Sequence, residues 1–507
     1  MVQQIDLFIY NAVILTQSTS VPIATSMAIL NGKIIALFEH NDSSPYQAKI
    51  SIDAQQKVIL PGFIDAHCHL QAMVSEPFNI HIPTSYQTKE AFSAYLLEQI
   101  SRIPNGNWVR INGYHPFHFP HIEPLSMAML DELSTKHPIR VRYVTRHTSV
   151  LNSKSWDYFK QALENHSNNG IHIELDSLGQ PTGIIHGADA LLNEFVLPKL
   201  PEEQWLAGIE ALQSKLLSLG ITTVCDASPT TSASQLAIWK KAAQHFWKIP
   251  VHWMTGSPHF EDLAKNLQPI PIFKRNALKI VLETMPEIYP TKDAVVQMMK
   301  QAFLANSPVA IHVVNPEMVW HAIDSLQTAR QQLPEVKGVC RIEHLSLCPE
   351  AFFDMVHELQ IQVVTNPPFI DIHGDRYLQH VDENEHSWLY PVNSLLQRGI
   401  TVAAGSDAPV APISPWLGMH AACTRQSKDG LQVNIREAVS RLDALNLYTT
   451  HAALVIGEQH QIGQLAPGFD ANFIIVEHHP INCTVAQLQN MQVLETWIAG
   501  ERLYHSS

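Results

Sequence analysis

Four histidines and one aspartate stand where short apolar segments of the chain end, and residues of these types can bind a metal ion. His67 and His69 form a His-Cys-His triplet after one such segment. His312, His344 and Asp407 end three later segments, and Asp407 lies in a Gly-Ser-Asp-Ala-Pro turn. Imidazole nitrogens and a carboxylate form a ligand set suited to zinc, with positions left for water. The chemistry that this set predicts is hydrolysis by metal-activated water.

Each of these signals has a plainer alternative when it is taken alone. In an extended chain the side chains at i and i+2 point the same way, so His67 and His69 can converge on one ion. In a chain with 28 histidines, however, such a triplet also arises by chance. A single histidine at a strand end is more often a core or rim residue, and an Asp before Ala-Pro is often a turn or helix-cap residue. Lys279, near the start of another apolar segment, is ordinarily a surface residue. The position of these residues in the fold must therefore decide between metal binding and these alternatives.

That position follows from the order of the elements. Short apolar segments alternate with helical patterns, for example at residues 292–306 and 317–333, which is typical of parallel strands joined by crossover helices. The predicted strands are residues 58–65, 221–226, 251–254, 278–283, 309–313, 339–344, 361–365 and 401–407. Eight such units predict an α/β fold of the (β/α)8 TIM-barrel type, whose enzymes carry their active sites at the carboxyl ends of the strands. The candidate ligands stand at those ends.

The remaining segments predict two additions to the barrel. Residues 6–16, 27–37, 471–476 and 493–504 are rich in β-forming residues, with Asn31-Gly32 and Ala499-Gly500 as turn signals. We expect residues 1–57 and 460–507 to form one composite β-sandwich domain, and residues 58–459 to form the barrel. The stretch 71–220 after the first strand is too long for a loop and holds a strand signal at 140–145, so it predicts an inserted subdomain.

Composition excludes several classes of function. The chain has 33 Lys+Arg against 47 Asp+Glu, a formal charge of −14 without blocks of like charge, which disfavours nucleic-acid binding. No apolar run reaches the ~18 residues that cross a bilayer, and the N-terminus lacks a secretory pattern. The six cysteines form no CxxC pair, which favours reduced thiols. We expect a soluble cytoplasmic protein with a small-molecule substrate and no membrane partner, and its 16% charged residues permit a homodimer.

Several segments match a known family in order along nearly the whole chain. They are residues 58–70 (VILPGFIDAHCHL), 220–226 (GITTVCD), 341–344 (RIEH), 405–409 (GSDAP) and 463–476 (GQLAPGFDANFIIV). These motifs resemble the amidohydrolase superfamily, in particular the amidohydrolase-3 group of metal-dependent hydrolases that includes N-substituted formamide deformylases. The chain departs from that group after Lys279, where residues 283–286 read Glu-Thr-Met-Pro in place of the common Asp-Gly-Ser-Leu.

The resemblance implies a metal centre with two Zn²⁺ ions, although other divalent metals are compatible with such ligands. His67 and His69 would hold the more buried ion, and His312 and His344 the more exposed one. Lys279 would be carbamylated by carbon dioxide and would bridge the two ions as an anionic carboxylate.

The resemblance also implies a reaction, the hydrolysis of a carbon–nitrogen bond in an amide, formamide or cyclic amide. Asp407 would bind metal, accept a proton from the attacking water and deliver it to the leaving nitrogen. Tyr114, His115 and His147 in the insert, and Arg376, are candidates for substrate contact, although nothing in the sequence fixes where they point.

Two alternatives remain at this level. A mononuclear zinc deaminase acting on a cyclic or heteroaromatic amine would use the same histidines and Asp407 but would not need Lys279 as a bridge. A non-catalytic scaffold that keeps the barrel for assembly fits less well, because every expected ligand type is present.

Overall fold

The computed structural model describes residues 3–40, 45–83, 88–166, 170–266, 272–284 and 287–506. The chain forms two compact units. The first consists of Met1–Gln71, Ile209–Leu282 and Thr291–Ser507, and the second of Ala72–Gly208 with Glu283–Pro290.

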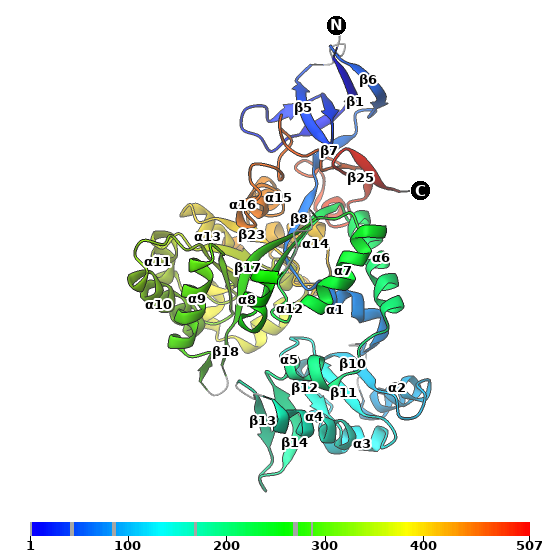
Figure 1. The fold of residues 1–507 in the computed structure, drawn as a ribbon, viewed down its shortest axis with the longest axis vertical. Helices are drawn as coiled ribbons and strands as arrows, with labels where there is room; N and C mark the ends of the chain where they lie inside the picture. Colours follow the sequence, from blue (N-terminus) through cyan, green and yellow to red (C-terminus); the bar gives the residue numbers. More distant parts are fainter. Residues whose placement is uncertain are drawn as a thin grey trace. The chain divides into compact units, whose positions relative to one another are not determined.

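An eight-stranded sheet forms the centre of the first unit (Figure 1). Neighbouring strands pair in parallel and follow the chain order from β8 to β23. The strands are β8 (Phe63–Cys68), β15 (Ile221–Asp226), β16 (Val251–Thr255), β17 (Phe273–Val281), β20 (Val309–Val313), β21 (Cys340–His344), β22 (Gln362–Thr365) and β23 (Val402–Ala404). The segment after β23 returns to the end of β8, where the amide of Asp407 donates to His67 O at 2.7 Å. The sheet is thus a nearly closed barrel, as the alternating pattern predicts.

Helices follow the strands and cover the barrel from outside. They are α6 (Glu202–Ser218), α7 (Ala233–His245), α8 (Ser257–Asn266), α9 (Lys292–Leu304), α10 (Pro316–Gln332), α11 (Phe353–Glu358), α12 (Pro368–His380), α13 (Val392–Gln397), α14 (Pro415–Thr424), α15 (Arg441–Leu447) and α16 (Thr450–Val455). Local sequence sets their starts: Thr291 caps α9 by accepting from Ala294 N, and Asn315 caps α10 ahead of a proline at the first helical position. The predicted helices at 292–306 and 317–333 are confirmed.

The first predicted strand, residues 58–65, is wrong as a single barrel strand because the structure divides it at Gly62. β7 (Val58–Pro61) belongs to another sheet, and β8 begins at Phe63. A Cβ atom at Gly62 would lie 2.2 Å from Thr222 Cγ2, so only glycine fits at this position without a steric clash. Hydrophobic runs cannot reveal such a change of sheet, since both halves are buried.

Two further sheets contain the strands from both ends of the chain. The six-stranded sheet has the order β26-β25-β24-β7-β2-β3, so its blue N-terminal and red C-terminal strands lie side by side (Figure 1). Its other strands are β2 (Val13–Leu15), β3 (Ile23–Ala24), β24 (Phe473–Val476), β25 (Val493–Ile498) and β26 (Glu501–His505). The four-stranded sheet has the order β5-β4-β1-β6, with β1 (Gln4–Tyr10), β4 (Ser26–Leu30), β5 (Lys33–Phe38) and β6 (Gln47–Asp53). One apolar cluster, which includes Ile9, Met27, Ile59 and Phe473, joins the two sheets.

Both predicted turns in these sheets are present. Asn31 and Gly32 have φ values of 51° and 75°, and Ala499 and Gly500 have φ values of 48° and 74°. Two successive residues with positive φ match the twist of a tight hairpin.

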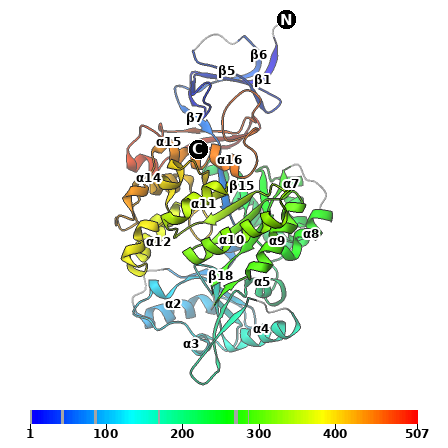
Figure 2. The same ribbon diagram turned by 90° about the vertical axis from the view of Figure 1, so that its left-hand side faces the viewer.

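The second unit has a mixed six-stranded sheet of its own, drawn in light blue to green in Figure 2. Its order is β13-β14-β12-β11-β10-β9, with β9 (Ile80–His81), β10 (Val109–Tyr114), β11 (Ile139–Tyr143), β12 (Thr148–Leu151), β13 (His172–Leu175) and β14 (Pro181–His186). Its longer helices are α2 (Lys89–Ser101), α3 (Met127–Leu133) and α4 (Ser153–Asn165). The strand predicted at 140–145 is confirmed as β11. We call this unit the insert.

A short hairpin after the fourth barrel strand belongs to the insert. It consists of β18 (Glu283–Thr284) and β19 (Ile288–Tyr289), and Met285 and Pro286 lie outside the described residues. A Cβ atom at Gly170 would lie 2.5 Å from Tyr289 Cε1, and one at Gly187 would lie 2.7 Å from Glu283 Oε2. The fourth barrel strand therefore ends at Val281, although the sequence pattern extends it to residue 283.

Among the described residues, every helix is too short or too polar to traverse a lipid bilayer.

Candidate active site

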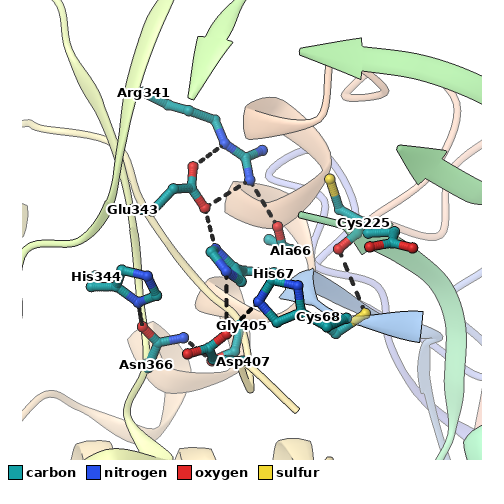
Figure 3. Close-up of polar contacts among 12 residues, drawn as sticks. Ala66, His67, Cys68, Cys225, Arg341, Glu343, His344, Asn366, Gly405 and Asp407 are labelled. Carbon is teal, nitrogen blue, oxygen red and sulfur yellow. Dashed lines mark hydrogen bonds and ion pairs between the residues drawn. The ribbon is translucent and has the colours of Figure 1, made fainter. Parts of the chain in front are cut away.

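The candidate ligands meet at the carboxyl ends of the barrel strands (Figure 3). One ligand atom from each of His67, His344 and Asp407 lies within 4.8 Å of the others, and all three residues are buried. Asp407 Oδ1 is 3.3 Å from His67 Nε2 and 2.9 Å from His69 Nε2. The ring of His312 lies 4.5 Å from that of His344, centroid to centroid. The structure thus brings together all four predicted histidines and the aspartate.

The turn after β23 places Asp407 against the end of β8. A Cβ atom at Gly405 would lie 2.5 Å from His67 Cβ, so a glycine is required where the two segments meet. One carboxylate oxygen of Asp65 accepts hydrogen bonds from the amides of His67 and Ser406, each at 3.1 Å. These contacts join β8 to the turn that carries Asp407.

Three of the histidines use Nδ1 for a hydrogen bond within the protein, which leaves Nε2 for a ligand. The partners are the Glu343 carboxylate for His67, Asn366 Oδ1 for His344 at 2.6 Å, and Ser228 Oγ for His69 at 3.2 Å. Histidines that bind metal are commonly oriented in this way by a hydrogen bond at the other ring nitrogen.

The protonation states of these groups also suit a cation. Burial lowers the pKa of His69 to about 4 and that of His344 to about 3, so both imidazoles are neutral at pH 7. Burial alone would raise the pKa of Asp407, but its contacts with the rings of His67 and His69 outweigh this effect and hold the pKa well below its usual range. Neutral imidazole and ionised carboxylate are the forms that bind metal.

Lys279 lies inside the barrel on β17, with 4% of the residue exposed. Its Nζ makes no hydrogen bond with any described residue. Burial lowers the pKa of this amine, and its positive charge in turn lowers the pKa of His69 and His344, which places it within electrostatic reach of both. The alternative that Lys279 is a surface residue is therefore excluded.

This set of residues fits a divalent cation. A buried carboxylate and buried imidazole nitrogens converge on one place, and a buried amine without a hydrogen bond to any described residue lies near them. Such a group of polar atoms is costly to bury unless a further partner satisfies it.

The backbone is also unusual at two of the candidate ligands. His344 has φ of 71° and Asp407 has φ of 55°, in the left-handed region that residues other than glycine rarely adopt. Strain of this kind is concentrated at functional sites, where it turns a side chain in a direction that regular strand geometry does not allow.

The four predicted substrate-contact residues lie in different surroundings. Tyr114 is fully buried in the apolar core of the insert, and its hydroxyl accepts a hydrogen bond from Leu125 N. His115 precedes a short 3₁₀ helix in the insert, and its Nδ1 accepts from Phe117 N at 3.2 Å.

His147 and Arg376 are both partly exposed. His147 Nδ1 is 3.3 Å from Glu283 Oε1, and 41% of its side chain is exposed. Arg376 lies on α12, with its guanidinium over the Tyr377 ring at 5.4 Å. Substrate contact by these residues stays a prediction, and the burial of Tyr114 gives it a packing role in the insert.

Sequence reasoning missed the residues that orient the histidines. Glu343, Asn366 and Ser228 carry no metal-ligand spacing, and their partners lie far away in the chain. One signal was available for Glu343. Arg341 and Glu343 are charged residues on a strand whose residues are all buried, and a strand buried on both faces rarely contains charges without a function.

Comparisons with known proteins agree with this geometry. The sequence pattern of the Amidohydrolase family matches residues 51–504. The N-substituted formamide deformylase of Arthrobacter pascens is 27% identical and is matched over 99% of both chains. The putative amidohydrolase YtcJ of Bacillus subtilis strain 168 is 23% identical over 92% of both chains.

Among solved structures, an uncharacterized metal-dependent hydrolase from Pyrococcus horikoshii OT3 has the same fold, with a TM-score of 0.74. It is 20% identical, and the match covers 95% of this chain and 99% of that protein. The resemblance drawn from the motifs is confirmed, and the chain belongs to the amidohydrolase family of hydrolases acting on carbon–nitrogen bonds.

Proposed function

We propose that the protein hydrolyses the carbon–nitrogen bond of a small amide, formamide or cyclic amide at a centre of two Zn²⁺ ions. The observation that carries the proposal is the meeting of His67, His344 and Asp407 at the carboxyl end of the barrel. The similarity to an N-substituted formamide deformylase over 99% of both chains supports formamides as the first substrates to test.

The residues that would hold the ions are His67, His69, His312, His344, Asp407 and carbamylated Lys279. Zinc bound there would lower the pKa of a water molecule and polarise the substrate carbonyl. Imidazole and carboxylate ligands also accept manganese or iron, so the metal in the cell depends on its availability.

Lys279 has the surroundings that carbamate formation needs. The amine must be neutral to attack carbon dioxide, and burial favours the neutral form of this group. The reaction joins Nζ to the carbon of carbon dioxide and releases a proton, which leaves an anion among neutral imidazoles. The anion would satisfy the buried Nζ position that has no hydrogen-bond partner among the described residues.

Asp407 would move the proton. Its carboxylate stays ionised at pH 7, so it can accept a proton from the attacking water. It then delivers that proton to the leaving nitrogen, because an amine leaves an amide readily only when it is protonated. Such acid–base catalysis contributes about 10²- to 10⁴-fold to a rate.

The test of the proposal is metal content per chain, measured by elemental mass spectrometry on protein purified without chelator. We expect two zinc ions in the wild type and one or none in Lys279→Ala, because the variant lacks the bridge. In Lys279→Ala the turnover of an N-substituted formamide should fall together with the loss of the second ion. Added propionate should partly restore the second ion and the turnover of this variant, since it can fill the space of the carbamate. A ¹³C signal from labelled carbon dioxide should appear in the wild type and be absent from Lys279→Ala.

One ion in both proteins, with activity kept in the variant, would contradict the bridged centre. That result would favour the mononuclear deaminase, and heteroaromatic amines would become the substrates to screen.

A further inference from the structure

A buried ion pair lies inside the barrel next to His67, and the proposed reaction does not use it. Arg341 and Glu343 are both on β21, with 1% and 0% of the residue exposed. Burying two charges carries a large desolvation penalty, so an ion pair in this position must have a structural or functional reason.

Arg341 and Glu343 form hydrogen bonds with each other and with neighbouring groups (Figure 3). Arg341 donates from Nε to Glu343 Oε1 at 2.5 Å and from Nη2 to Glu343 Oε2 at 3.0 Å. Glu343 Oε2 also accepts from His67 Nδ1. The carboxylate therefore lies between a guanidinium and an imidazole.

Arg341 also fixes this carboxylate relative to strands on other sides of the barrel. Its Nη2 donates to Ala66 O on β8 at 2.9 Å, although β8 and β21 are not neighbours in the sheet. Its Nη1 lies 3.4 Å from Asn276 Oδ1 on β17. The side chain thus spans the barrel and connects the strands that carry His67, Lys279 and His344.

We infer that Glu343 is a positioning residue that sets the tautomer and donor strength of His67, and that Arg341 holds Glu343 in place for this task. An anionic acceptor requires the proton of the neutral imidazole to reside on Nδ1, which leaves the lone pair of Nε2 for the metal. The corresponding partners of His344 and His69 are the uncharged Asn366 and Ser228, so among these three histidines His67 is the one whose basicity is raised most. The inference rests on the proposed metal centre.

The competing explanation is that the pair only stabilises the fold. Removing one member of a buried ion pair leaves an uncompensated charge, so a single substitution would destabilise the protein under either explanation. Replacement of both members by apolar residues of similar volume removes that penalty. The two explanations then differ, because the apolar pair can restore the fold but cannot accept a hydrogen bond from His67.

The experiment compares the wild type, Glu343→Gln and the double variant R341M/E343L. We expect the double variant to recover the thermal stability of the metal-free wild type, while its zinc affinity, measured by competition with a chelator, falls by about 10- to 100-fold. Glu343→Gln should also bind zinc more weakly. The matched control is Glu437→Gln, another buried glutamate, which accepts from Ser394 N at 2.9 Å away from the candidate ligands. This control should lower stability without changing zinc affinity.

A second measurement reports the tautomer without metal. In metal-free wild type labelled with ¹⁵N-histidine, at a pH where His67 is neutral, Nδ1 should carry the proton; in the double variant the proton should be shared between both ring nitrogens. The His67→Asn variant assigns the signals.

The outcomes separate this inference from the proposed function. Wild-type zinc affinity in the double variant, or an Nε2–H tautomer of His67 in the metal-free wild type, would overturn the inference and leave the zinc centre intact. A wild type that binds no divalent metal would remove the proposed centre, and the inference with it.

Discussion

Asp407 is the residue on which the site converges. Its amide donates to His67 O, its carboxylate contacts the Nε2 atoms of His67 and His69, and its backbone adopts φ of 55°. Backbone and side chain therefore have separate tasks. The backbone closes the barrel, and the side chain presents an ionised oxygen among neutral imidazoles.

Replacement of this carboxylate by an amide should separate the two tasks. In Asp407→Asn the backbone contacts remain but the side chain can no longer accept a proton at pH 7. We expect the turnover of an N-substituted formamide to fall by about 10²- to 10⁴-fold, with thermal stability close to that of the wild type. Kinetics at saturating zinc and a thermal unfolding scan measure the two effects. Undiminished turnover by this variant would rule Asp407 out as the proton carrier.

The sequence predicts this site unevenly, and the reason is physical. His67, His69, His312, His344 and Asp407 can be found because each ends an apolar strand, and the strand ends of a barrel share one face. Glu343 and Asn366 escape prediction because their function depends on which nitrogen of a distant histidine they contact.

Among the elements, the segment from β7 to β8 shows how one residue divides a strand between two sheets. β7 pairs with β2 and β24, while β8 pairs with β15, and Gly62 separates them. Gly62 N donates to Asn472 O at 3.0 Å, so the passage is also held by the C-terminal part of the chain. The position of His67 and His69 therefore depends on a contact that precedes them by several residues.

A methyl group at this passage should disturb the fold measurably. In Gly62→Ala the new Cβ atom would lie 2.2 Å from Thr222 Cγ2 and 2.8 Å from Thr222 Cβ. We expect the free energy of unfolding in urea to fall by about 1–3 kcal/mol, as is usual for overpacking. The loss should be smaller in a Thr222→Ala background, because the nearest atoms are then absent. An equal loss in both backgrounds would show that the contact with Thr222 is not the cause.

The prediction of strands and turns succeeds where burial or a positive φ determines which residue types the sequence contains. Strands such as β20 and β23 are short apolar runs because both faces are covered, and the tight hairpins contain residues that tolerate positive φ. It fails at Gly62, because a buried run has the same composition on either side of a change of partner. It also fails at Glu283, which is only partly buried and pairs with Tyr289 in a separate hairpin.

At the scale of the whole molecule, one histidine of the barrel interior should make stability depend on pH. His252 on β16 is 3% exposed, and burial, with the charges of Lys274 and Arg341, lowers its pKa from 6.5 to about 3. In the unfolded chain its pKa returns to about 6.5. Below that pH the unfolded chain binds a proton that the folded chain does not, so stability falls as the pH falls from about 6.5 towards about 3.

The size of this effect can be measured by substitution. Between pH 7 and pH 5, His252 should account for about 2 kcal/mol of the lost free energy of unfolding. We expect His252→Gln to lose less stability than the wild type over this interval when both are metal-free, because glutamine does not titrate. Urea unfolding at the two pH values provides the comparison. Parallel losses in the two proteins would mean that other groups carry the acid sensitivity.

The insert is built from two separate stretches of chain, and this has a consequence for how such enzymes diversify. The chain passes between the two units at 71/72, 208/209, 282/283 and 290/291. The second stretch of the insert begins at Glu283, shortly after the strand that carries Lys279. Glu283 contacts His147, and Gly187 and Gly170 leave room for Glu283 and Tyr289. A recombination event that exchanged Ala72–Gly208 alone would therefore pair a foreign sheet with a resident hairpin that does not fit it. We therefore expect an exchanged insert to fold only when both stretches, Ala72–Gly208 and Glu283–Pro290, are replaced together.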